Sequence, residues 1–130
     1  MIRVLIMEDN VSLAQHWKQT FELNADYQVV ICHNAKEALG FLDGEQYDLV
    51  ITDLFVPGSS GGLGVLLKIF KMGQDRPLAI AVTGEKVPSV MSDVKNVYLA
   101  QAARLGAAIT LEKPFPAAEL IIAAQGLLED

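Results

Sequence analysis

Five short apolar runs recur along the chain, each followed by a segment with helical spacing, and this alternation limits the fold more than any other feature. The runs are residues 2–7, 27–32, 47–52, 77–82 and 107–111. They are rich in strand-forming residues, and several lack a regular alternation of apolar and polar positions, which is typical of strands buried on both faces. We therefore predict five strands.

The segments that follow these runs have the pattern of helices. They span residues 11–24, 34–44, 63–72, 89–105 and 116–129. In the first, Trp17 and Phe21 belong to an apolar series with intervals of three and four, so we expect both side chains to face the core or to be half-buried. In the second, Asn34 is suited to cap the helix, Glu37 follows three residues later, and Gly44 marks the end.

Strands that alternate with helices predict a parallel sheet covered by helices on both faces and joined by right-handed crossovers. We expect a flavodoxin-like (βα)5 doubly wound sandwich with the strand order 2-1-3-4-5. A chain of 130 residues has the length of one domain, and no linker, repeat or low-complexity tract divides it. The expected organisation is a single domain over residues 1–130.

Composition narrows the setting of this domain. Apolar residues make up 52% of the chain and charged residues 20%, which is typical of a globular protein. The net charge of −6 argues against direct nucleic-acid binding, and no apolar run has the length of a membrane span. A single cysteine, Cys32, excludes an internal disulfide and fits a reducing compartment. Without a signal peptide, we expect the cytoplasm.

Acidic residues stand where two of the predicted strands end. Glu8 and Asp9 follow the first strand and Asp53 follows the third, while Thr83 and Lys113 follow the fourth and fifth. With the order 2-1-3-4-5, the three carboxylates converge at the sheet edge where such folds bind ligands. Their mutual repulsion would be relieved by a cation, and an all-oxygen ligand set of high negative charge suits Mg²⁺.

These residues also match a known family. The matching set is Glu8–Asp9, Asp53, Pro57, Gly61, Thr83 and Lys113–Pro114. In this set, and in the order of its predicted elements, the chain resembles the receiver domain of bacterial two-component response regulators. The resemblance implies a phosphorylation-activated switch that belongs to a phosphorelay and is not an enzyme with a diffusible substrate. Such a domain catalyses only its own phosphoryl transfer and slow autodephosphorylation.

By this resemblance, Asp53 is the phosphoacceptor and takes its phosphoryl group from a sensor histidine kinase or a histidine phosphotransfer protein. Mg²⁺ would be bound by Glu8, Asp9, Asp53 and the backbone carbonyl of Phe55. An effector domain outside this chain and a homodimer are further partners that the family suggests. The chemistry agrees with these roles, because a carboxylate nucleophile can form an acyl phosphate.

The family also implies roles for two residues at the other strand ends. Lys113 would pair with the acceptor carboxylate and then with the phosphoryl group, and the hydroxyl of Thr83 would contact the phosphoryl group after transfer. The Lys113–Pro114 peptide bond is the candidate for the cis bond that is usual in the family. A side chain two residues after Asp53, here Phe55, and one two residues after Thr83, here Glu85, are expected to influence the lifetime of the acyl phosphate.

Two features depart from the family pattern. Thr110 occupies the position where receivers often have the Tyr or Phe whose rotation reports phosphorylation. The segment 84–99 is longer than usual, which lengthens either the loop after the fourth strand or the helix that follows, so we expect a face that is remodelled for a particular partner. Tyr98 is a candidate to replace the missing aromatic, although we expect it simply to pack.

Other functions compete with the receiver interpretation. A receiver-like adaptor that binds partners without phosphorylation is the main alternative. A Mg²⁺-dependent phosphatase with an aspartyl nucleophile usually has a second Asp where this chain has Phe55, and it needs a cap domain. An FMN carrier of the same fold needs a hydroxyl-rich phosphate loop after the first strand. The glycine-rich residues 58–64 lack the ending of a phosphate-binding loop, so we expect a flexible connection there.

Overall fold

The structure is a computed structural model that describes residues 1–54, 61–84 and 92–129, with residues 92–96 and 98 described by their backbone. Its strands are β1 (Ile2–Met7), β2 (Tyr27–Cys32), β3 (Leu49–Asp53), β4 (Leu78–Thr83) and β5 (Ile109–Glu112). They form a parallel sheet of order β2-β1-β3-β4-β5, as the sequence predicts. The helices are α1 (Val11–Glu22), α2 (Ala35–Gly44), α3 (Gly61–Lys71), α4 (Ser92–Arg104) and α5 (Ala117–Leu128), with a short 3-10 turn, η1 (Gly73–Asp75).

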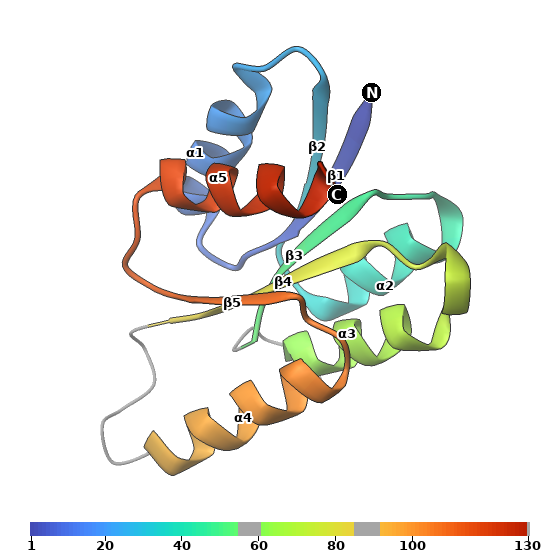
Figure 1. Ribbon diagram of the computed structural model, residues 1–130, viewed down its shortest axis with the longest axis vertical. Coiled ribbons are helices and arrows are strands. Elements are labelled where there is room, and N and C mark those ends of the chain that lie inside the picture. The colour runs from blue at the N-terminus through green and yellow to red at the C-terminus, as the bar shows by residue number, and fades with distance from the viewer. Residues whose placement is uncertain (55–60, 85–91, 130) are drawn as a thin grey trace.

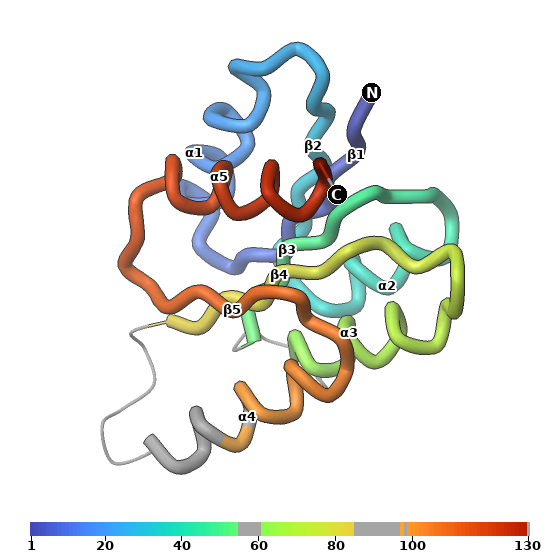
Figure 2. Tube along the Cα trace, in the orientation of Figure 1, coloured from blue at the N-terminus to red at the C-terminus, as the bar shows by residue number. Residues whose placement is uncertain are grey.

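The helices cover the two faces of the sheet and enclose two hydrophobic cores. Helices α1 and α5 lie on one face, and α2, α3 and α4 lie on the other (Figure 1). Trp17 and Phe21 of α1 and Leu120 of α5 belong to the first core, together with inward residues of β1, β3 and β4. The expectation that Trp17 and Phe21 face the core is confirmed. Figure 2 follows the chain from β1, inside the sheet, to α5, which returns beside α1.

Local signals explain where the first two helices begin. The side chain of Asn10 accepts a hydrogen bond of 3.0 Å from the amide of Leu13 and caps α1. Asn34 caps α2 in the same way, with 2.9 Å to the amide of Glu37. Each cap satisfies one of the amides that a helix leaves without an internal partner at its N-terminus. The predicted cap at Asn34 is therefore confirmed.

Some predicted boundaries are wrong by a few residues. Strand β3 continues to Asp53, and β5 begins at Ile109 and not at residue 107. Helix α3 begins at Gly61, two residues before the predicted start, so the last part of the glycine-rich segment is helical and not a connection. Gly61 has φ of 53°, a conformation that glycine adopts without the steric cost of a side chain.

The strands differ in how deeply they are buried. Every residue of β3 is buried, as expected for a strand covered on both faces. Strand β5 lies at the sheet edge and alternates between half-buried and exposed positions. Ile109 and Leu111 pack against the core under α1 and α5, whereas Thr110 and Glu112 are exposed. The face of β5 that bears Thr110 is therefore open.

Candidate functional site

Three carboxylates meet at the carboxyl ends of β1 and β3. These strands are neighbours, with Met7 of β1 paired to Thr52 of β3, so the residues that follow them are brought side by side. Glu8, Asp9 and Asp53 each offer a carboxylate oxygen, and these oxygens lie within 4.8 Å of one another. The structure thus brings together the acids that the sequence places at strand ends.

Burial makes this acidic group unusual. Glu8 is fully buried and Asp53 is 3% exposed, whereas Asp9 is half-buried. The second carboxylate oxygen of Glu8, Oε2, accepts a hydrogen bond of 2.9 Å from the backbone amide of Asn10. The turn between β1 and α1 is therefore folded around the Glu8 carboxylate, and Asn10 in turn caps the helix.

Lys113, which follows β5, supplies a positive charge to this group. Its Nζ donates to Oδ2 of Asp53 at 2.9 Å and also contacts Oε1 of Glu8. The lysine side chain is only 13% exposed. Burial lowers the pKa of Lys113, but the hydrogen bonds to Glu8 and Asp53 outweigh this effect, so that its pKa is raised overall. The Lys113–Pro114 peptide bond is cis.

The pKa of Glu8 is raised because the carboxylates are buried close together. Burial raises it to about 7, and the neighbouring carboxyl groups of Asp9 and Asp53 add to the increase. The amide of Asn10 and the ammonium of Lys113 lower it but do not reverse the shift. Glu8 therefore ionises less readily in the protein than at its ordinary pKa of 4.5, and a bound divalent cation would relieve this effect.

Thr83 is the last residue of β4, the strand next to β3, and it is fully buried. Asp53 pairs with Val82 in the sheet register, so Thr83 lies one position further toward the same edge as the carboxylates. Among the residues that the structure describes, none forms a hydrogen bond with the Thr83 hydroxyl. Because a buried hydroxyl without a partner is costly, this group is suited to a ligand oxygen.

Two supporting residues of the site had no recognisable signal in the sequence. Nδ1 of His33 lies 2.9 Å from the carbonyl oxygen of Glu8 and donates a hydrogen bond to it, because a backbone carbonyl can only accept. This hydrogen bond ties His33 to the turn that carries the acidic residues. Gly62 of α3 lies directly behind Asp53, and a Cβ at this position would lie 2.1 Å from the Asp53 carbonyl oxygen. Both contacts depend on backbone geometry, which residue type and spacing do not reveal.

Several sequence predictions concern residues that the structure leaves undescribed. Pro57, Phe55 with its backbone carbonyl, and Glu85 lie outside the described ranges. The same holds for residues 85–91 of the segment 84–99, and the side chains of residues 92–96 and of Tyr98 are also undescribed. These points stay predictions.

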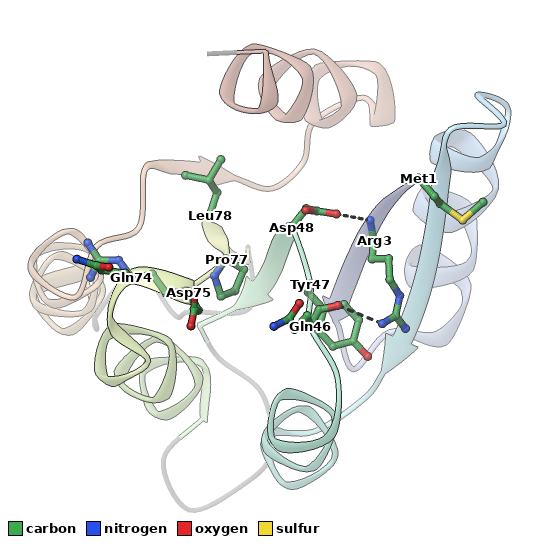
Figure 3. Close-up of a pocket in the computed structure, with 10 residues that line it drawn as sticks. Met1, Arg3, Gln46, Tyr47, Asp48, Gln74, Asp75, Pro77 and Leu78 are labelled. Carbon is green, nitrogen blue, oxygen red and sulfur yellow. Dashed lines mark hydrogen bonds between the residues drawn. The ribbon is translucent and has the colours of Figure 1, made fainter.

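The opposite end of the sheet has a hollow with a different character (Figure 3). The backbone amide of Arg3 donates to Asp48 Oδ2 at 2.8 Å, and its guanidinium donates to the Gln46 carbonyl and to Glu45. The guanidinium also lies over the ring of Tyr47, 4.8 Å from its centroid. These groups form hydrogen bonds and ion pairs with one another. The hollow at the amino ends of the strands is therefore lined by a structural hydrogen-bond network.

Comparison with known proteins decides the family. A sequence model of the response regulator receiver domain matches residues 4–125. The chain belongs to the response regulator receiver domain family. Phosphorylation-activated signalling in two-component systems is the standard role of this family. Across the parts of the receiver domain that the structure describes, no helix has both the length and the apolar character to span a bilayer.

Curated relatives of the receiver domain are longer proteins. The transcriptional regulatory protein FlgR of Helicobacter pylori is 30% identical over 114 residues, which cover 88% of this chain and 26% of FlgR. The transcriptional regulatory protein PcoR of Escherichia coli is 28% identical over 128 residues, which cover 98% of this chain and 52% of PcoR. The receiver domain thus spans about a quarter of one relative and about half of the other.

Solved structures agree with the fold. A CheY-like receiver domain protein of Methanospirillum hungatei superimposes with a TM-score of 0.84 and 25% identity, covering 99% of this chain and 94% of that one. The response regulator TrrA of Thermotoga maritima, solved in complex with Mg²⁺-BeF, gives a TM-score of 0.75 and 27% identity, covering 98% and 100%. The receiver fold and the flavodoxin-like strand order are confirmed.

Proposed function

We propose that Asp53 is the phosphoacceptor of this receiver domain and that Mg²⁺ binds between Glu8, Asp9 and Asp53. The observation that carries the proposal is the meeting of three carboxylates with Lys113 at one sheet edge, with oxygens within 4.8 Å. Phosphoryl transfer to an aspartate needs a positioned carboxylate and stabilisation of the developing charge, which a divalent cation and a lysine ammonium can supply. The backbone carbonyl of Phe55 is a further proposed ligand.

In the proposed reaction, an Asp53 carboxylate oxygen attacks the phosphorus of a phosphohistidine. A P–O bond forms as the P–N bond breaks, and the imidazole leaves with the electron pair of that bond and is protonated. When bound, Mg²⁺ neutralises charge on the carboxylates and on the phosphoryl oxygens. Lys113 holds Asp53 before transfer, and afterwards its ammonium can pair with a phosphoryl oxygen, since Nζ is already 2.9 Å from the acceptor carboxylate.

Thr83 completes the proposed site after transfer. Its hydroxyl is buried at the end of β4, next to the acceptor strand, and no described residue satisfies it. A phosphoryl oxygen on Asp53 would accept a hydrogen bond from this hydroxyl. Movement of Thr83 toward the phosphoryl group then links the chemistry to β4 and to the segment that follows it.

The biological setting is also proposed. A sensor histidine kinase or a histidine phosphotransfer protein is the phosphodonor, and residues 1–130 form one receiver unit in the cytoplasm. The relatives named transcriptional regulatory proteins are longer, which supports an effector domain outside this chain as the output. The unit catalyses only its own phosphorylation and slow dephosphorylation, does not itself bind nucleic acid, and is a candidate for homodimerisation.

Intact-mass spectrometry tests the proposal. The protein is incubated with acetyl phosphate and Mg²⁺, and Asp53→Asn and an EDTA-treated sample serve as controls. We expect one phosphoryl adduct on the wild type that is lost in both controls. If the folded wild type gains no adduct, the phosphorylation-independent adaptor is the better description, and an adduct that persists in Asp53→Asn would assign the acceptor to another residue.

A further inference from the structure

Helix α1 places the ring of Trp17 beside Lys113, one of the residues of the site. Trp17 is the only tryptophan in the chain and is 1% exposed. It lies on α1, the helix that starts directly after the acidic turn. The same helix therefore follows the proposed metal ligands and carries this indole.

Trp17 contacts the loop after β5 on both sides of its proline. Its ring stacks on Phe115, with centroids 5.6 Å apart and an angle of 14° between the planes. Its face also lies toward Lys113, whose Nζ is 5.8 Å from the ring centroid. One side chain of α1 thus holds the residues before and after Pro114.

The lysine ammonium consequently has two kinds of partner. It contacts the carboxylates of Glu8 and Asp53, and it also lies over the indole ring. A cation within about 6 Å of an aromatic centroid is attracted by the negative face of the ring, and the attraction is stronger where water is excluded. Since the Lys113 side chain is only 13% exposed, the contact belongs to the stronger class.

A core-filling role does not explain the choice of tryptophan. The indole nitrogen Nε1 is buried, and no described residue accepts its hydrogen bond. A phenylalanine or leucine would occupy the core without an unsatisfied donor. What tryptophan offers here beyond those residues is the strongest cation-attracting face and a wide surface for stacking.

We infer that Trp17 is a positioning residue for Lys113 and fixes the ammonium where it meets Asp53. This inference rests on the proposed function, because it assigns to Lys113 a part in phosphoryl transfer. We assign Trp17 no contact of its own with the phosphoryl group or with Mg²⁺. It acts by limiting the positions of the lysine side chain and of the loop that carries it.

The test compares phosphorylation rates of Trp17→Leu and Trp17→Phe with a matched control, Phe21→Leu. Phe21 is equally buried on the same helix, but its ring packs on Tyr27, with centroids 5.3 Å apart. With acetyl phosphate and saturating Mg²⁺, we expect Trp17→Leu to slow adduct formation about tenfold, Trp17→Phe about threefold, and Phe21→Leu less than twofold. Urea unfolding of each variant separates this loss from lost stability.

Two further measurements make the outcome decisive. In a Lys113→Gln background, Trp17→Leu should cause no additional slowing, because the group that it positions is gone. If Trp17→Leu does not fold, a second experiment takes its place. The fluorescence emission of Trp17 is measured in the Lys113→Gln variant, and we expect it to differ from the emission of the wild type. Three results would overturn the inference. They are equal phosphorylation rates for Trp17→Leu and Phe21→Leu, a full slowing by Trp17→Leu in the Lys113→Gln background, or an unchanged Trp17 emission in Lys113→Gln. Absence of phosphorylation in the wild type would instead refute the proposed function.

Discussion

Asp53 has its backbone in contact with the start of α3, and that contact leaves no space for a side chain. The Cβ of an alanine at Gly62 would overlap the carbonyl oxygen of Asp53, with a separation of 2.1 Å, and would approach the Cα of Leu54 at 2.7 Å. Real Cβ atoms do not come so near to backbone atoms, so either the helix or the strand end must shift. The position of the proposed acceptor carboxylate thus depends on a residue with no functional group.

We predict that Gly62→Ala lowers the free energy of unfolding by about 2 kcal/mol, as overpacking in a tight site does. Phosphorylation by acetyl phosphate should slow as well, because Asp53 is displaced. Urea unfolding and intact-mass kinetics measure the two effects. Gly40→Ala is the control, since Gly40 lies within α2 with nothing near its Cβ position, and there alanine should be neutral or stabilising. Similar behaviour of the two variants would contradict the prediction.

The charged residues at strand ends could be predicted from the sequence as members of the site. The residues that support the site by packing against it could not. Glu8, Asp53 and Lys113 follow apolar runs, and parallel topology alone brings such positions to one edge. Trp17 looked like an ordinary core residue, because its helical spacing shows which face of α1 is buried but not which side chain lies across from it. The contact of Gly62 with Asp53 was hidden for the same reason.

At the scale of elements, β5 is the strand that departs most from its neighbours. It is an edge strand of four residues with one open face. Thr110 is exposed on that face, at the position where receivers often have an aromatic switch. The described residues do not enclose the Thr110 side chain.

We predict that Thr110→Tyr changes the free energy of unfolding by less than about 0.5 kcal/mol, because an exposed edge position accepts an aromatic residue. Leu111→Ala, on the opposite face of the same strand, should cost about 2 kcal/mol, because Leu111 packs on the core under α5. Chemical unfolding of both variants is the measurement. A large loss for Thr110→Tyr would show that this face is covered in solution.

The order and type of the helices and strands could be predicted, because the spacing of apolar residues follows the burial of each element. Some boundaries of these elements could not be predicted. The apolar run before Asp53 stops one residue before the ladder does, since Asp53 still pairs with Val82. Helix α3 starts among glycines because its first residue needs a positive φ, a backbone requirement that resembles a loop in the sequence. Boundaries of this kind are set by hydrogen bonds, not by composition.

At the scale of the whole molecule, the acidic site links stability to pH. The pKa of Glu8 is about 7 in the folded protein and 4.5 in its ordinary state. A raised pKa stabilises the fold below the ordinary value, and this contribution is lost as the pH rises through the folded value. In EDTA, we predict that Glu8 removes on the order of 3 kcal/mol of stability between about pH 4.5 and about pH 7.

Urea unfolding of the wild type and of Glu8→Gln across this pH range measures the difference, because glutamine does not ionise. The wild type should lose stability with rising pH relative to the variant. Saturating Mg²⁺ should reverse the trend for the wild type, since the cation binds the ionised carboxylates and not the unfolded chain. Parallel pH profiles of the two proteins in EDTA would contradict this account of Glu8.

The strand order also has a consequence for how the chain acquires its charges during synthesis. Strand β1 lies between β2 and β3, and β4 and β5 extend the sheet outward from β3, so each new strand pairs with one already made. The sheet can therefore grow from the ribosome in the order of translation. Glu8, Asp9 and Asp53 are all present once β3 has emerged, whereas Lys113 arrives with the last strand. Until then, the nascent domain carries its three acids without Lys113, so cations from the surrounding solution would have to balance the charge of these carboxylates.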